Sequence, residues 1–378
     1  MFNFYKNKNF YRAMLCISAG CGFYLTQIVE VSPIYFFYIF ALIFISCGLF
    51  SKGVKLYRSS NIPYVLFFFG TAHVTLYTVW LSPFNSTVGF YLNYFSMILS
   101  WYLLQYLNLR QMERCFGLFI SIVIVLGTCE GIIRFFFPFQ DFSQEFLTYV
   151  SQSGSFFYMY KFNSIMYKDS NFVAAWILVA LISVIELFGW TRAKWKITFL
   201  FILLIFTISR ASIIVFFLYL AYKYLLTLSS KNKFIYLFSL ISLPFVFSLS
   251  GIAADDSFQT KLQILDQLHQ NYFKNIEVTT FLFGVGLSNS IQVLGGYLSA
   301  HNFFFETLLD LGFVGFSLFL SSIIFLASSA GRPGWFLVTF YFLMGLSFSP
   351  VTIPYFFVVL SLCCYIRKAR GIECYKAA

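Results

Sequence analysis

Long apolar runs alternate with short polar segments along the whole chain. Twelve runs are long enough to be drawn as helices crossing a membrane, whose hydrocarbon core is ~30 Å thick. They lie at 13–30, 32–50, 62–82, 87–107, 116–138, 171–189, 195–208, 211–228, 234–250, 302–329, 334–348 and 351–366. The pattern predicts an all-α integral membrane protein, a single polytopic domain over 1–378 with about 12 transmembrane helices.

Two of the polar segments are much longer than the rest. The first spans 139–170, and the second spans 251–301. Within the second, apolar residues recur near helical spacing at Phe258, Leu262, Leu265 and Tyr272. We expect both segments to be periplasmic loops, and the amphipathic helix of the second to lie on the membrane surface or to cover a cavity.

The basic residues follow the predicted topology. Alternate short segments and the termini hold 19 of the 25 Lys and Arg, at positions 6, 8, 12, 52, 55, 58, 110, 114, 192, 194, 196, 223, 231, 233, 332, 367, 368, 370 and 376. Cytoplasmic segments of membrane proteins carry such an excess of positive charge. Both termini are therefore predicted to be cytoplasmic, and the long loops are predicted to face the opposite side.

Composition excludes several classes of protein. Hydrophobic residues make up 60% of the chain and charged residues only 10%, and the mean hydropathy is +0.80, which rules out a soluble domain. The net charge of +11 reflects topology rather than a nucleic-acid partner. The eight cysteines lie in apolar runs or beside basic segments, so we expect neither a disulfide framework nor a metal site. No nucleotide-binding loop or hydrolase motif occurs.

Arg210 lies between two runs, 195–208 and 211–228, at their predicted outer end. The first run has 14 residues and rises only ~21 Å, so the turn is expected below the outer surface unless the helix begins earlier. A guanidinium at this depth could hold a lipid-linked pyrophosphate through two hydrogen bonds. The alternative is an arginine that reaches ordinary lipid phosphate.

Other charged residues lie near the predicted outer side. Arg134 follows Glu130 by one helical turn, so it is either a substrate contact or half of an internal ion pair. Lys161, Lys168 and Asp169 precede the sixth run and are either substrate contacts or solvated loop charges.

The tenth run begins with an unusual set of polar residues. His301 stands where the second long loop meets the run, and an imidazole at a membrane rim is often functional. Asn302, Glu306 and Asp310 follow at intervals of four and share one helix face. The alternative is that Asn302 caps the helix and the two carboxylates pair inside the bundle. Gly312 is expected to allow close packing.

Three motifs together resemble the bacterial O-antigen polymerase and O-antigen ligase superfamily. Segment 167–172 (Tyr-Lys-Asp-Ser-Asn-Phe) is similar to the family's aspartate-proline-asparagine segment, and Asn171 is also a plausible N-cap. Ser209-Arg210 is similar to its serine-arginine turn, and Ala300-His301-Asn302 to its histidine-asparagine signature. Two positions depart from the family pattern, because Ser170 replaces a proline and Lys161 stands where an arginine is common.

The resemblance implies a GT-C-like membrane glycosyltransferase in the bacterial cytoplasmic membrane. The implied donor is an undecaprenyl-pyrophosphate-linked oligosaccharide, used without a metal or other cofactor. His301 and Arg210 are the implied catalytic residues, because an imidazole can take a proton from the attacking hydroxyl while a guanidinium stabilises the leaving pyrophosphate. The implied substrate-binding residues are Arg134, Lys161, Lys168, Asp169, Asn171, Asn302 and Glu306.

Three functions fit this reading of the sequence. We favour a polymerase that joins repeat units into O-antigen or a related surface polysaccharide, with membrane lipids, a chain-length regulator and a flippase of the same pathway as partners. A ligase would instead transfer the glycan to lipid A-core. A flippase or other transporter of lipid-linked sugars also needs about twelve spans and charges within the bundle.

Overall fold

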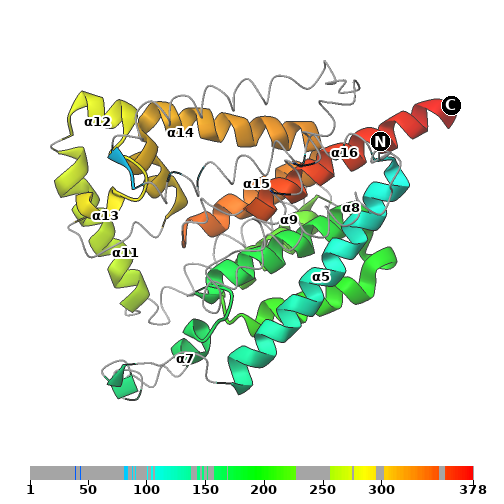
Figure 1. Ribbon diagram of the computed structural model, residues 1–378, viewed down its shortest axis with the longest axis horizontal. Helices are drawn as coiled ribbons and strands as arrows, with labels where there is room; N and C mark the ends of the chain where they lie inside the picture. The colour runs from blue at the N-terminus through cyan, green and yellow to red at the C-terminus, as the bar shows by residue number, and fades with distance from the viewer. Residues whose placement is uncertain are drawn as a thin grey trace.

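The computed structural model describes 107–137, 157–167, 169–226, 256–274, 276–294, 302–348 and 354–377, together with short pieces between 39 and 104 and between 143 and 151 (Figure 1). Every regular element in these residues is a helix. The all-α prediction is therefore confirmed for the part of the chain that the structure describes.

Three of the described helices are long and apolar enough to cross a membrane. They are α5 (Leu109–Phe136), α8 (Ser170–Phe206) and α14 (Phe303–Ala330). These helices support the prediction of a membrane protein. The runs predicted at 13–30, 32–50, 62–82, 87–107 and 234–250 lie largely or wholly outside the described residues.

Helix α8 contains two of the predicted runs and reverses direction between them. Its backbone leaves helical geometry at Gly189 (φ 74°, ψ 167°) and at Ala193 (φ −129°, ψ 22°). A straight helix of 37 residues would be ~55 Å long, yet Asn171 at its start is hydrogen-bonded to Ser209 just beyond its end. The chain therefore turns back at 189–193, where Arg192 had indicated a break between spans.

The remaining long helices pack around α8. They are α9 (Arg210–Leu225), α15 (Arg332–Gly345) and α16 (Pro354–Ala377). Helix α8 contacts α5, α9, α15 and α16, while α14 packs on α15 and α16 (Figure 1). Large apolar side chains such as Trp176, Phe116 and Phe356 are fully buried in the core that these helices share.

A second, smaller core joins the segment 256–294 to α14. This segment holds α11 (Asp256–Gln267), the π-helix η5 (Leu268–Phe273), α12 (Val278–Phe283) and α13 (Ser290–Val293), and residues of α11, η5 and α13 enter the core. Buried Ile264, Leu268, Tyr272 and Leu294 pack against Leu309 of α14. A helix within 251–301 is therefore present, and it packs an apolar face on α14, but this face is not the predicted stripe. Tyr272 is buried as predicted, whereas Leu262 and Leu265 are exposed and Ile264 and Leu268 are buried instead.

Helix α14 is not one straight span, as the run 302–329 had suggested, but bends at Gly312. Gly312 has a φ of 66°, and a Cβ atom there would overlap the backbone nitrogen of Gly284. Two backbone hydrogen bonds fix this contact: Val285 N–H donates to the carbonyl of Leu309 (2.9 Å), and Gly286 N–H donates to that of Asp310 (3.0 Å). The prediction that Gly312 allows close packing is confirmed, although the partner is a loop rather than another span.

Candidate functional site

The starts of α8 and α9 are joined by the residues of two of the sequence motifs. Asp169 is the N-cap of α8, and its carboxylate accepts hydrogen bonds from the backbone and side-chain nitrogens of Asn171 (2.9 and 3.0 Å). The side-chain oxygen of Asn171 in turn accepts a bond from the Ser209 hydroxyl (2.7 Å), which also lies 3.1 Å from the hydroxyl of Ser212. The motifs at 167–172 and 209–210 therefore form one polar network.

The start of α14 lies at the same end of the bundle. Asn302 caps α14 by accepting hydrogen bonds from Phe304 N–H (2.9 Å) and Phe305 N–H (3.2 Å). Its amide donates to the carbonyl of Leu346, just beyond α15 (3.5 Å), and Met344 in α15 contacts the Ser212 hydroxyl (3.4 Å). The end of α15 thus bridges the start of α14 to the start of α9.

Three helix N-termini consequently gather at one end of the bundle. Each carries a partial positive charge, so the starts of α8, α9 and α14 together favour an anion. Those of α8 and α14 are capped by Asp169 and Asn302. Ser209, the N-cap of α9, makes no capping bond, because its hydroxyl is directed to Asn171. The start of α9 is the point of this end best suited to an external anion.

Two cations among the described residues belong to this end. Arg210 is the first residue of α9 and is exposed. Lys161, in α7 (Phe157–Phe162), lies 3.6 Å from the carboxylate of Asp169 and 5.7 Å from the ring centre of Phe162. Both members of the Lys161–Asp169 pair are partly exposed, so the pair itself contributes little stability. It places an ammonium group beside the network that joins α8 to α9.

Arg134 is enclosed rather than presented to a ligand. It is 1% exposed, and its guanidinium forms an ion pair with Glu130, which is 2% exposed. It also donates to the carbonyl of Phe206 (3.4 Å), and Asn163 donates to the carbonyl oxygens of Arg134 and Phe137 at the end of α5. The internal ion pair that the sequence offered as the alternative is present.

The polar residues along the first segment of α14 divide into separate roles. Asn302 is the helix cap, as the alternative interpretation stated. Asp310 is buried, and its carboxylate accepts bonds from the backbone N–H groups of Ser288 (3.0 Å) and Ser290 (3.2 Å). Asp310 therefore holds the loop before α13 against α14. Glu306 is half-buried between these two positions.

Two of the predicted site residues, His301 and Lys168, lie outside the described residues. His301 directly precedes Asn302 in the chain, and Lys168 directly precedes Asp169. Among the ranges that the structure describes, no group of three or more His, Cys, Asp and Glu side chains is placed to hold a metal ion.

Sequence reasoning missed a charged cluster near the opposite end of the bundle. Glu186 is buried, accepts hydrogen bonds from the Tyr219 hydroxyl (2.6 Å) and from Lys223 (2.8 Å), and lies 3.8 Å from Arg332. The available signal was a single carboxylate inside the apolar run 171–189, because an ionised residue there requires partners.

Comparison with known proteins adds nothing to this description of the site. The chain matches no protein-family model and no curated protein.

Proposed function

We propose that the protein is a membrane glycosyltransferase that polymerises a polyprenyl-pyrophosphate-linked oligosaccharide. The supporting observation is the start of α9, where exposed Arg210 coincides with a helix N-terminus whose N-cap hydroxyl is directed elsewhere. A pyrophosphate has the charge and the paired oxygens that a guanidinium and a helix N-terminus both favour.

The proposed reaction exchanges one bond to the donor sugar for another. His301 accepts the proton of an acceptor hydroxyl, the hydroxyl oxygen attacks the anomeric carbon of the donor, and the bond from that carbon to the pyrophosphate oxygen breaks. Negative charge grows on the departing pyrophosphate, so a cation held in place before the reaction lowers the barrier. Arg210 has this role in the proposal, and Lys161 assists at longer range.

The motif residues Asp169 and Asn171 have a positioning role in this scheme. They connect the start of α8 to Ser209, the residue immediately before Arg210. Asn302, which directly follows His301 in the sequence, fixes the start of α14 next to the end of α15. The twelve-span GT-C-like architecture and the periplasmic location of this end are part of the same proposal.

Deleting the gene in its native bacterium and separating the lipopolysaccharide on a gel tests the proposal. Loss of a polymerase leaves core bearing a single repeat unit. Loss of a ligase leaves bare core while lipid-linked polymer accumulates, and loss of a flippase strands single units on the inner leaflet. Either of the last two patterns would overturn the assignment.

Complementation with point variants then tests the site. We expect Arg210→Ala to abolish the ladder of long chains and Arg210→Lys to restore it in part, because lysine keeps the charge but not the two-bond geometry. Arg192→Gln is the matched control, since it removes an exposed arginine from the turn within α8, away from the starts of α8 and α9. A full ladder from an Arg210→Ala protein that inserts normally would remove Arg210 from the mechanism.

A further inference from the structure

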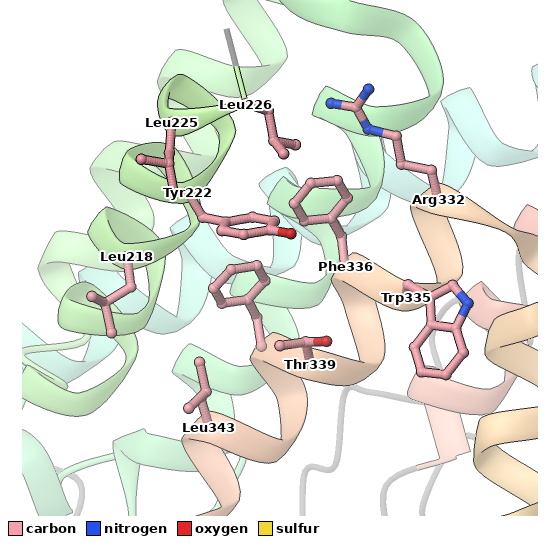
Figure 2. A pocket seen from close by; sticks show the side chains of 10 residues that line it. Leu218, Tyr222, Leu225, Leu226, Arg332, Trp335, Phe336, Thr339 and Leu343 are labelled. Carbon is pink, nitrogen blue, oxygen red and sulfur yellow. The ribbon is translucent and has the colours of Figure 1, made fainter. Parts of the chain in front are cut away.

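A groove of about 590 Å³ runs between α9 and α15, away from the candidate site. Each helix contributes a stripe of side chains at helical spacing, with Leu218 and Tyr222 on α9 and Trp335 and Leu343 on α15. The rings of Tyr222 and Phe336 meet edge to face across it, with their centres 5.7 Å apart (Figure 2). Leu218, Tyr222 and Trp335 remain substantially exposed, so the two helices leave an apolar channel that the described residues do not fill.

The groove has the length of one membrane leaflet. Arg332 and Leu343 mark its two ends on α15 (Figure 2). The eleven helical steps from Arg332 to Leu343 rise about 17 Å along the helix axis, close to half of the ~30 Å hydrocarbon core. An extended acyl chain whose headgroup lies beside Arg332 would therefore reach the middle of the bilayer.

The end of the groove at Arg332 has an excess of positive charge. Among the described residues, Arg332 pairs with the carboxylate of Glu186 at 3.8 Å, and this carboxylate is already paired with Lys223 at 2.8 Å. Glu186 is 5% exposed and the Arg332 side chain is 60% exposed. Two cations thus share one buried carboxylate, and the exposed cation lies at the mouth of the groove, where it complements an anionic headgroup.

We propose that this groove binds one anionic phospholipid, with its phosphate at Arg332 and an acyl chain along the stripe to Leu343. The lipid belongs to the leaflet at the Arg332 end. Helix α9 begins at Arg210, but the residues with which it lines the groove, such as Tyr222 and Leu225, lie in its C-terminal half. The lipid site is therefore separate from the one proposed for the pyrophosphate. The inference does not depend on the enzymatic activity.

Native mass spectrometry of the purified full-length protein tests the site. The detergent-solubilised protein is stripped of lipid and mixed with equal amounts of phosphatidylglycerol and phosphatidylcholine. We expect the wild-type protein to retain one phosphatidylglycerol. Arg332→Gln should lower this retention about tenfold through loss of a charge-assisted contact, while Glu186 keeps Lys223 as its partner.

A second variant addresses the groove independently of the charge. Thr339→Trp places a large side chain on the exposed groove stripe of α15 while Arg332 is kept, and it should abolish retention of the lipid. Arg192→Gln is the control, because it removes an exposed arginine near the same end without touching the groove.

Three results would overturn the proposal. Equal retention of both lipids by all four proteins would show ordinary surface lipid. No retained lipid in the wild-type protein would show that the groove is closed by other parts of the chain. Displacement of the lipid by an equal amount of polyprenyl phosphate would assign the groove to the carrier instead.

Discussion

The buried pair of Glu130 and Arg134 offers a test that separates packing from substrate binding. Both side chains are at most 2% exposed and lie in α5, one of the three helices suited to cross the membrane. Arg134→Met removes the cation and leaves the Glu130 carboxylate buried without its ion-pair partner, which costs about 3–5 kcal/mol of unfolding free energy. Changing both residues, as Glu130→Leu with Arg134→Met, removes both charges and should restore stability to within about 1–2 kcal/mol of the wild-type protein.

The measurement is a double-mutant cycle in mixed detergent micelles. Unfolding of the four proteins is followed by circular dichroism as the fraction of denaturing detergent rises. Because Glu130→Leu likewise leaves a buried charge unpaired, the coupling free energy should be about 4 kcal/mol or more. A residual cost is expected because the carbonyl of Phe206 also loses a donor. If Arg134→Met proves as stable as the wild-type protein, the pair is not structural. If the double variant is stable but makes no polymer, Arg134 contacts the substrate after all.

Three further predictions concern the polar network beside Arg210 and the loop that packs against α14. Ser209→Ala removes the bond to Asn171 and should lower the unfolding free energy by about 1 kcal/mol and shorten the polymer ladder; an unchanged ladder would contradict the role given to this network. Gly312→Ala should prevent normal folding because of its positive φ and its contact with the loop backbone, whereas Gly131→Ala, which has open space, should fold normally in the same fluorescence-detected chromatography. Asp310→Ala leaves two backbone N–H groups without their acceptor and should increase hydrogen exchange in the loop before α13, with protection equal to the wild-type level as the opposing result.

Sequence alone predicted the features that depend on local spacing or on the cost of charge in a membrane. The separation of one helical turn between Glu130 and Arg134 gave an internal ion pair as one of two alternatives, and the structure contains that pair. The reversal within α8 follows from Arg192 and Lys194, because two charges between apolar runs are more stable at a membrane surface than inside it.

Features that depend on tertiary contacts could not be predicted in the same way. Asp310 accepts a hydrogen bond from Ser288, which lies 22 residues earlier in the chain, and Glu186 pairs with residues of α9 and α15. Neither contact follows a helical spacing, so the sequence pattern could not predict it. The sequence identified Gly312 as a small residue suited to close packing. It did not show that α14 bends there or that the backbone of Gly284 packs against it.

The relation between the three motifs is a further case. The sequence placed each one near the outer end of a predicted span, and for 167–172 and 209–210 the structure adds a direct hydrogen bond between Asn171 and Ser209. Of the third motif, the structure describes only Asn302. Its side chain donates to the carbonyl of Leu346, which places it at the same end of the bundle as the other two motifs. The span count, the orientation of the termini and the chemistry assigned to His301 stay predictions.

Turnover by the purified protein tests the central claim most directly. Wild-type, Arg210→Gln and Arg192→Gln proteins are reconstituted in liposomes with a polyprenyl-pyrophosphate-linked repeat unit, and the release of free polyprenyl pyrophosphate is measured by mass spectrometry. We expect release and chain growth with the wild-type protein and the Arg192 variant, and a loss of at least about a hundredfold with Arg210→Gln. Equal turnover by all three proteins would contradict a role for the start of α9 in holding the leaving pyrophosphate.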